Sequence, residues 1–299
     1  MKRLVLVAAV AMLAACGRPA EPPAPPPNPA PPLPPLPELK PSEDFSKDDF
    51  LPLPDAPAGF SWDLREGVSH NYAYEQESHL IVTASGAGQS GKVASRTQWK
   101  GDAKVVGGGT RGELVFVSAP IAQWNNNAPL SSEELNKVPK QVVQLMVRED
   151  GVFESRTVRS GQEDPKLDLF FALPSRELKP GEKETKEVHL SHVPEDAKYH
   201  GRQEIAHAGR RKVGRHECVK LLSRLDLEAV PPGDGQGRMV GWIAAYFDPK
   251  ERRFVRVEAA LVLAVDVRRE MRPADLKIPA YWLLNRVQAD SRVTITLKD

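Results

Sequence analysis

The sequence has almost no net charge, and it has no apolar run long enough to cross a membrane as a helix. Its 299 residues include 41 Lys and Arg against 40 Asp and Glu. Nucleic-acid-binding proteins are usually clearly basic, so this balance argues against nucleic acid as a partner. The apolar stretch from Leu4 to Ala15 has about a dozen residues, whereas a membrane-spanning helix needs roughly 20. We therefore expect no permanent transmembrane helix.

The first sixteen residues form a recognisable export signal. Lys2 and Arg3 precede the apolar stretch, which ends in Leu13-Ala14-Ala15-Cys16. A basic head, a short apolar core and small residues are typical of a secretory signal. With cysteine directly after the two alanines, the segment resembles the lipobox of bacterial lipoprotein precursors. The resemblance implies that residues 1–15 are a signal peptide and that Cys16 is the mature N-terminus, anchored in a membrane by palmitate and other acyl chains.

The same resemblance suggests a location. Gly17 follows Cys16, at the position where lipoproteins kept in the inner membrane often carry aspartate. For a bacterium with two membranes, this implies the outer membrane, on its periplasmic or surface side. Stable anchoring needs more than one acyl chain, and the resemblance implies three. Removal of the signal peptide takes away Lys2 and Arg3. The mature chain then has 39 basic and 40 acidic residues and stays nearly neutral.

Cysteine is scarce, which excludes a disulfide framework. The second and last cysteine is Cys218. If Cys16 is acylated, Cys218 has no partner, although exported proteins often form disulfides. A packed core must then hold the fold, and we expect Cys218 to be a small buried residue of that core.

Proline is abundant in one place. Twelve prolines lie between Pro19 and Pro37. Such segments adopt extended polyproline II at about 3.1 Å per residue, so residues 18–41 predict a spacer of up to ~70 Å. We assign residues 16–57 to the lipidated N-terminus and this linker.

From residue 58 to 299 the pattern predicts one β-rich domain. Polar and apolar residues alternate, as in half-buried strands, and the stretch Phe254–Arg268 is long enough to predict a curved strand. Asp150-Gly151 and Asp248-Pro249-Lys250-Glu251 predict hairpin turns. We expect a mainly β fold of long curved antiparallel strands. The architecture is either a half-barrel or two similar lobes, at about 65–160 and 183–299, because Tyr72 and Tyr199 each open a long strand.

Helices should be few and short. Ser131 and Glu134 form a capping box for one short helix, which Pro139 ends, and Tyr281–Gln288 is a candidate for a second. Two glycine-rich segments match nucleotide-binding patterns but lack the helix that such sites need. We therefore interpret Gly86–Lys92 and Gly107–Gly112 as turns between strands and expect no cofactor.

No catalytic or metal-binding set stands out. The seven histidines are scattered, with no clustered carboxylates or thiols, so no metal site is expected. A basic cluster at Arg210, Arg211 and Lys212 is a candidate contact for lipid phosphates or anionic envelope polymers, since arginine binds phosphate well. The simpler alternative is a solvated hairpin tip.

The domain also resembles uncharacterised β-rich domains of bacterial envelope proteins. The similar residues are Phe170-Phe171-Ala172-Leu173-Pro174, then Lys179-Pro180-Gly181-Glu182, then Gly214–Lys220. The resemblance covers residues 65–270 and implies no known activity. Long bent strands also resemble the half-barrels of periplasmic lipoprotein carriers. We expect a non-catalytic binding or assembly domain for a lipid, an envelope polymer or an envelope protein. The alternative is an envelope hydrolase whose active site forms only in space.

Replacing Cys16 by Ala should release the chain from membranes, because the acyl chains have no other attachment point. Membrane and soluble fractions of cells expressing either form would be compared by immunoblot. If C16A still sediments with membranes, the lipobox interpretation is wrong.

Overall fold

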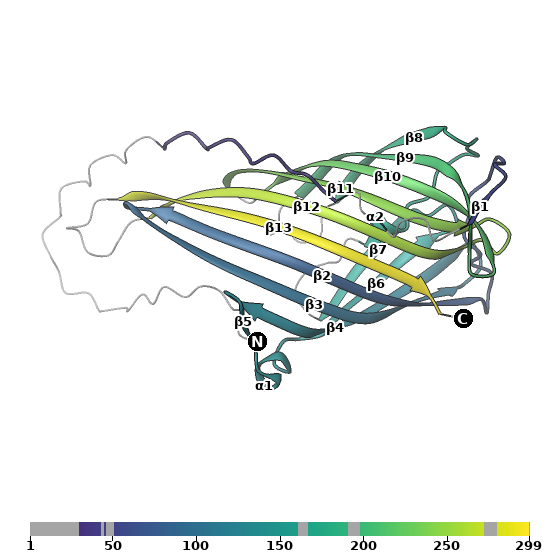
Figure 1. Cartoon of the computed structure of the whole chain (residues 1–299), viewed down its shortest axis with the longest axis horizontal. Helices are drawn as coiled ribbons and strands as arrows, with labels where there is room; N and C mark the ends of the chain where they lie inside the picture. The colour runs from purple at the N-terminus through teal and green to yellow at the C-terminus, as the bar shows by residue number, and fades with distance from the viewer. Residues whose placement is uncertain are drawn as a thin grey trace, which may run out of the picture.

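Strands form most of the structure. The computed structural model describes residues 30–42, 45, 51–160, 167–190, 198–231, 233–271 and 280–298. The strands are β1 (Leu51–Leu53), β2 (Ser69–Gly86), β3 (Gln89–Gly107), β4 (Arg111–Asn125), β5 (Ala128–Pro129), β6 (Gln141–Arg148), β7 (Phe153–Ser160), β8 (Lys183–Leu190), β9 (Lys198–Val213), β10 (His216–Val230), β11 (Asp234–Asp248), β12 (Arg253–Met271) and β13 (Tyr281–Leu297). Two one-turn helices, α1 (Ser132–Leu135) and α2 (Leu167–Phe170), complete the described elements (Figure 1).

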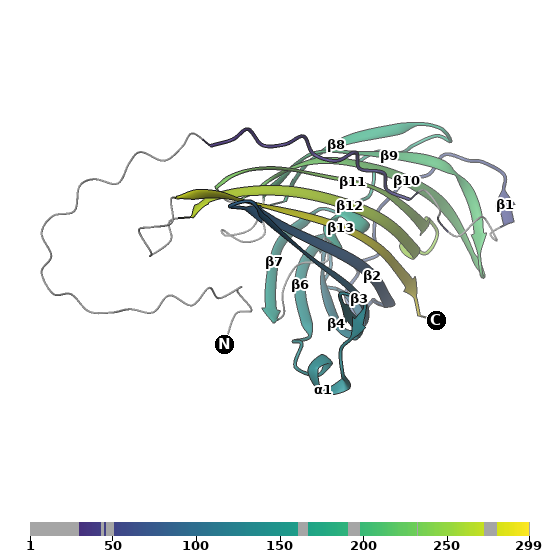
Figure 2. The same ribbon diagram turned by 60° about the vertical axis from the view of Figure 1, so that its left-hand side comes forward.

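All these strands belong to one antiparallel sheet. Its order is β1-β9-β10-β11-β12-β13-β2-β3-β4-β6-β7, with β5 beside β4 and β8 beside β9. The sheet curls into a half-barrel with a concave and a convex face (Figure 2). The predicted mainly β fold of long curved antiparallel strands is therefore confirmed. Strand β13, the last in the chain, pairs with both β12 and β2 and so joins the two halves of the sequence.

Tight turns connect the long strands where glycine was expected to do so. Ala87 and Gly88 have φ angles of 49° and 76° between β2 and β3. Positive φ at both central residues is the geometry of a two-residue hairpin turn that follows the twist of the strands. The segment Gly107–Gly112 likewise joins β3 to β4. Each glycine-rich segment contains a turn between strands, as predicted, but the turn of the first is only Ala87 and Gly88, and Gln89 to Lys92 belong to β3.

The helix predictions were correct in one case and wrong in the other. The Ser131 hydroxyl accepts from the Glu134 amide and the Glu134 carboxylate accepts from the Ser131 amide, which confirms the capping box of α1. Tyr281–Gln288 is not helical but opens β13, because β12 and β2 satisfy its backbone from both sides. Helix α2 was not predicted from the sequence. Neither α1 nor α2 nor any other helix among the described residues is long and apolar enough to span a membrane.

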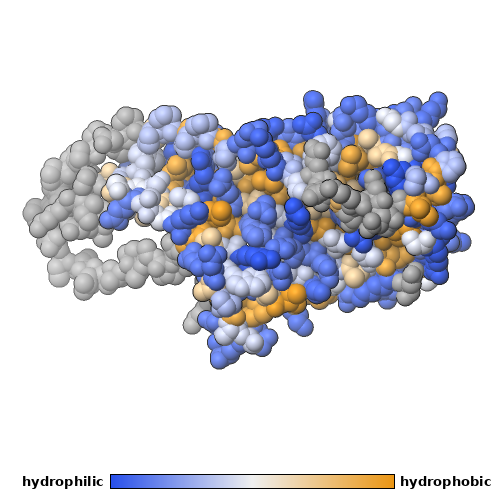
Figure 3. Space-filling model, viewed as in Figure 1, coloured by the Kyte–Doolittle hydropathy of each residue, from blue (hydrophilic) through white to orange (hydrophobic). Residues whose placement is uncertain are grey.

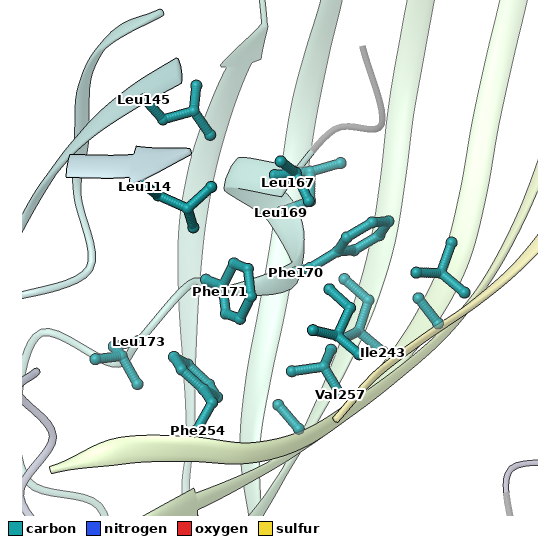
Figure 4. Close-up of a cluster of buried hydrophobic side chains, with 14 of the residues drawn as sticks. Leu114, Leu145, Leu167, Leu169, Phe170, Phe171, Leu173, Ile243, Phe254 and Val257 are labelled. Atoms are coloured by element: carbon teal, nitrogen blue, oxygen red, sulfur yellow. The ribbon is translucent and has the colours of Figure 1, made fainter. Parts of the chain in front are cut away.

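One end of the concave face is filled by aromatic side chains. Phe171, directly after α2, lies 5.4 Å from Trp62 and 5.3 Å from Phe254, between ring centroids. Phe254 in turn contacts Phe247 at 5.3 Å, and most of these pairs meet edge to face, a favoured geometry. Figure 4 shows α2 and the residues after it projecting into this cluster, with Leu114 and Leu145 on the opposite wall. We call this the filled end.

The segment before β2 closes the filled end. Backbone bonds join Trp62 N to the Glu149 carbonyl (2.6 Å), Asp63 N to the Arg252 carbonyl (2.8 Å) and Gly109 N to the Leu64 carbonyl (2.9 Å). These partners lie in three separate turns of the half-barrel. The segment therefore ties together loops far apart in sequence, and its apolar side chains complete the aromatic cluster.

Residues 30–42, which we call the strap, lie along the convex face. Gln236 Nε2 donates to the Pro34 carbonyl (2.6 Å), Arg286 Nη2 to the Pro35 carbonyl (3.1 Å), and Arg268 to the Pro31 carbonyl. Figure 2 shows the strap outside the curled sheet. This part of the expected spacer is therefore held against the domain, and the ~70 Å reach predicted for a free segment is too long.

The face of the molecule seen in Figure 1 is mainly polar, with hydrophobic patches between the polar residues (Figure 3). Ion pairs join neighbouring strands of the sheet, for example Arg96 Nε of β3 to Glu77 Oε1 of β2 at 2.7 Å. Such exposed pairs each contribute little to stability. The fold is held chiefly by the filled end and by the sheet itself.

Asp63 should make stability depend on pH in acid. Hydrogen bonds from Arg65 lower the pKa of the Asp63 carboxyl from 3.8 to about 2. A lowered carboxyl pKa stabilises the fold above the unfolded value, and this contribution is lost as pH falls from about 4 to about 2. We expect Asp63→Asn to be less stable than wild type at pH 7 and nearly equal at pH 2, in urea unfolding followed at each pH. A difference that stays constant with pH would contradict the assignment.

Candidate binding site

Beyond the filled end, the concave face encloses a cavity of about 350 Å³. Strands from both halves of the sequence line it: β2, β3 and β4 on one side and β11, β12 and β13 on the other. Phe170 of α2 forms the boundary with the filled end. The sequence pattern predicted a curved sheet, and its concave side does hold a cavity. We call this cavity, together with the strand surface beyond it, the trough.

The lining of the cavity mixes apolar side chains with neutral polar ones, among them Ser95, Thr97, Gln123 and Gln141. The apolar residues that line the cavity include Leu80, Trp99, Phe170, Met239, Leu261, Leu263 and Val293. Period-two alternation puts these side chains on the concave face, since successive residues of a strand point to opposite faces. Leu80 is 39% exposed and Val93, on the neighbouring strand, is 52% exposed. Large apolar side chains exposed on a concave surface are typical of a ligand site.

A row of neutral polar side chains crosses the floor of the trough. The Tyr74 hydroxyl donates to Gln76 Oε1, Gln76 Nε2 donates to Ser78 Oγ at 2.6 Å, and Ser78 Oγ lies 3.0 Å from Ser291 Oγ. The row bridges β2 and β13, which pair directly at Ser78 and Ser291. Each hydroxyl keeps spare acceptor capacity because oxygen has two lone pairs. The row can therefore bond a neutral polar group placed above it.

The cavity carries no charge on its described lining. None of its lining residues is Asp, Glu, Lys or Arg, and its single histidine is His79. The ring of His79 lies 3.0 Å from Glu77 Oε1, and alternation directs both side chains to the convex face. An unpaired charge is costly to bury. The cavity is thus suited to an apolar ligand with at most a neutral polar group.

Among the described residues, the trough is open at the end opposite the aromatic cluster, where Val93 is 52% exposed. Many of its inward positions there are aliphatic, such as Val82, which pairs with Val93 on β3 and with Val287 on β13, and alternation also turns Asn285 inward. The β2–β3 turn and the start of β13 lie at this end (Figure 1). We call it the open end. The trough therefore runs from a closed aromatic base to an open aliphatic mouth.

The residues singled out in the sequence lie elsewhere. Cys16 is outside the described residues. Arg210, Arg211 and Lys212 lie near the end of β9 and pair with β1. The Arg210 guanidinium donates to the Pro54 carbonyl (3.3 Å) and lies 3.4 Å from Glu217. Arg210 is thus used within the fold, while Lys212 is exposed; contact of this cluster with an anionic surface stays a hypothesis.

A buried histidine–aspartate pair is present that no local sequence pattern indicates. His216 Nδ1 lies 2.9 Å from Asp248 Oδ2, and both side chains are almost fully buried. Asp248 Oδ1 also accepts from the backbone amides of Lys250 (2.9 Å) and Glu251 (3.0 Å). The carboxylate therefore fixes the β11–β12 turn, and His216 fixes the carboxylate. The two residues are 32 positions apart, so only the strand register brings them together.

This pair lies on the face opposite the trough. Ala244 packs in a convex cluster with Cys218 and Tyr246, whereas its neighbours Ile243 and Ala245 belong to the concave core. His216 is two residues from Cys218 and Asp248 two from Tyr246, so alternation puts both on the convex side. A ligand in the trough cannot reach them. Within the described residues, no group of three or more His, Cys, Asp or Glu is arranged to hold a metal ion.

Comparison with known proteins gives no family. No family model matches the chain, and no curated protein matches it. Among solved structures, the chain is similar to a DUF1329 family protein from Desulfovibrio piger, with 12% sequence identity and a TM-score of 0.12. That alignment covers 71% of this chain and 83% of the other. A likeness of this strength carries no argument about fold or function.

Cys218 should be inert in the folded protein. Its side chain is fully buried, as predicted, and burial raises the pKa of its thiol well above the ordinary value. Thiolate is the reactive form, so both access and ionisation oppose reaction. In the C16A chain, where Cys218 is the one thiol, we expect no reaction with Ellman's reagent until urea unfolds the protein. Rapid reaction of the native chain would contradict the buried position.

Proposed function

We propose that this chain is a bacterial envelope lipoprotein, anchored through Cys16, whose β-rich domain binds the acyl chain of a lipid in the trough without chemical conversion. The observation that supports this most directly is the cavity of about 350 Å³ with apolar walls and an uncharged floor. An apolar chain gains from leaving water in proportion to the area it buries. The neutral row at Ser78 and Ser291 suits an ester, amide or hydroxyl group of the lipid.

The groups at the trough favour binding over catalysis. Hydrolysis needs a nucleophile activated by a base within hydrogen-bond reach. Ser78 bonds to Ser291 and to Gln76, and none of these three residues is a base. The buried His216–Asp248 pair has the spacing of a base and its orienting carboxylate, but it lies on the other face. Our proposal is therefore a carrier or receptor for lipid rather than a lipid hydrolase.

Lipid is favoured over an envelope polymer by the chemistry of the walls. Glycan or peptide polymers present many polar groups. Beside Leu261, Leu263 and Met239, each of these groups would lose its hydrogen bonds to water without a replacement. An acyl chain presents none along its length. The open end offers entry along the strands, and the filled end sets a limit to how deep a chain extends.

Quenching of Trp99 by a brominated monoacylglycerol tests the proposal. Trp99 lines the cavity, whereas Trp124 lies under the Arg96 guanidinium, which is 5.1 Å from its ring centroid. With the full C16A chain, we expect saturable quenching that Trp99→Phe largely removes and Trp124→Phe retains. Leu263→Asp should weaken binding at least about tenfold, or 1.4 kcal/mol, because it buries a charge beside the ligand.

The matched control is Leu263→Met, which keeps volume and apolarity and should bind as wild type does. A brominated fatty acid at a pH where it is ionised should bind more weakly than the neutral monoacylglycerol. Quenching that never saturates, or that is the same in L263D and wild type, would contradict lipid binding in the trough. If the C16A chain still sedimented with membranes, that result would instead contradict the anchor alone.

A further inference from the structure

The strap occupies a site prepared for it on the convex face. A polyproline II segment has no internal hydrogen bonds and presents its carbonyls outward. Three adjacent strands supply the donors for these carbonyls: Gln236 from β11, Arg268 from β12 and Arg286 from β13. Gln236 and Arg286 both pair in register with Asp266 of β12, and Arg268 is two residues further along that strand. The three donors therefore lie close together and reach the carbonyls of Pro31, Pro34 and Pro35.

Carboxylates on the sheet hold the donating arginines in position. Arg286 forms two bonds with Asp266, at 2.7 Å and 2.8 Å, and Asp266 is completely buried. Asp234 pairs with Arg268, whose guanidinium lies 5.8 Å from the centroid of Trp282. A two-pronged arginine–carboxylate pair fixes the direction of its remaining N–H groups. The strap site is therefore organised before the prolines arrive.

The contacts also fix the direction in which the chain enters the domain. Pro31 to Pro34 lie beside Gly86 and Trp282, at the open end of the trough. Further along, Ser42 Oγ accepts from Arg292 at 3.1 Å, and β1 then pairs with the end of β9. The strap thus runs from the open end toward the filled end. Whatever precedes residue 30 joins the domain at the mouth of the trough.

We infer that the strap orients the domain on the membrane, with the open end of the trough facing the bilayer that holds Cys16. This rests on the anchor of the proposed function. Between Cys16 and Ala30 there are thirteen residues, which extend at most about 40 Å as polyproline II. A free linker of residues 16–57 would allow any orientation. The docked strap leaves the mouth of the trough as the part of the domain nearest the lipid, so an acyl chain enters along the strands.

Two labels at opposite ends of the sheet test the orientation. The acylated full chain is reconstituted into phosphatidylcholine vesicles containing a nitroxide-headgroup lipid, with one fluorophore at Gln89→Cys or at Glu251→Cys. Gln89 is the exposed first residue of β3 and Glu251 lies in the exposed β11–β12 turn. Strands of this length separate them by up to about 60 Å. We expect the nitroxide to quench the label at Gln89, by the open end, and to leave the label at Glu251 unquenched.

Release of the strap should abolish this difference. Gln236→Leu with Arg268→Gln removes two of the carbonyl donors, and the two labels should then be quenched to similar, low extents. Arg238→Gln is the matched control, since Arg238 pairs with Asp226 on the same face and makes no strap contact in the described residues. Protection of Cys218 from Ellman's reagent would confirm that each variant is folded.

The outcomes separate the two proposals. A chain that does not bind vesicles at all overturns the anchor, and the orientation with it. A chain that binds but shows equal quenching at Gln89 and Glu251 before the strap is released overturns the orientation alone. Stronger quenching at Glu251 does the same.

Discussion

The structure depends on how much of the concave face the chain can fill. A long curled sheet exposes more inward surface than the few residues outside it can cover. Trp62 before β2 and Phe171 after α2 meet Phe254 and close one end. No comparable segment among the described residues lies over Leu263 or Val82. The remaining inward surface is apolar with a row of neutral polar groups, and the trough is the direct result of this shortage of covering residues.

The two faces of the sheet then divide the work of the molecule. On the concave face, neutral polar groups such as Ser78 and Ser291 bond to each other, so the floor is polar without being charged. On the convex face, carboxylates hold arginines, and the arginines hold the strap. Successive residues of a strand point to opposite faces of the sheet. The same strands therefore form the binding surface on the concave face and the attachment surface on the convex face.

The sequence predicted the parts of this arrangement that depend on local pattern. Alternation in Phe254–Arg268 predicted β12, one of the two longest strands, and Ser131 with Glu134 predicted α1. Features that depend on register were out of reach: Ser78 and Ser291 are 213 positions apart, and His216 and Asp248 are joined only by pairing. The N-terminal part of β13 was predicted to be helical because its local sequence contains no information about the two strands that pair with it. The prolines predicted an extended segment but not the arginines that bind it.

The central claim is that the uncharged trough holds a lipid chain. Native mass spectrometry of the full C16A chain, isolated without detergent from the cells that make it, tests this most directly, because bound lipid appears as added mass that fragments can identify. The account predicts one acyl lipid with a neutral polar group next to the chain, lost in Leu263→Asp and kept in Leu263→Met. Protein that is lipid-free in both wild-type and Leu263→Met form, or that carries the same lipid after Leu263→Asp, would contradict it.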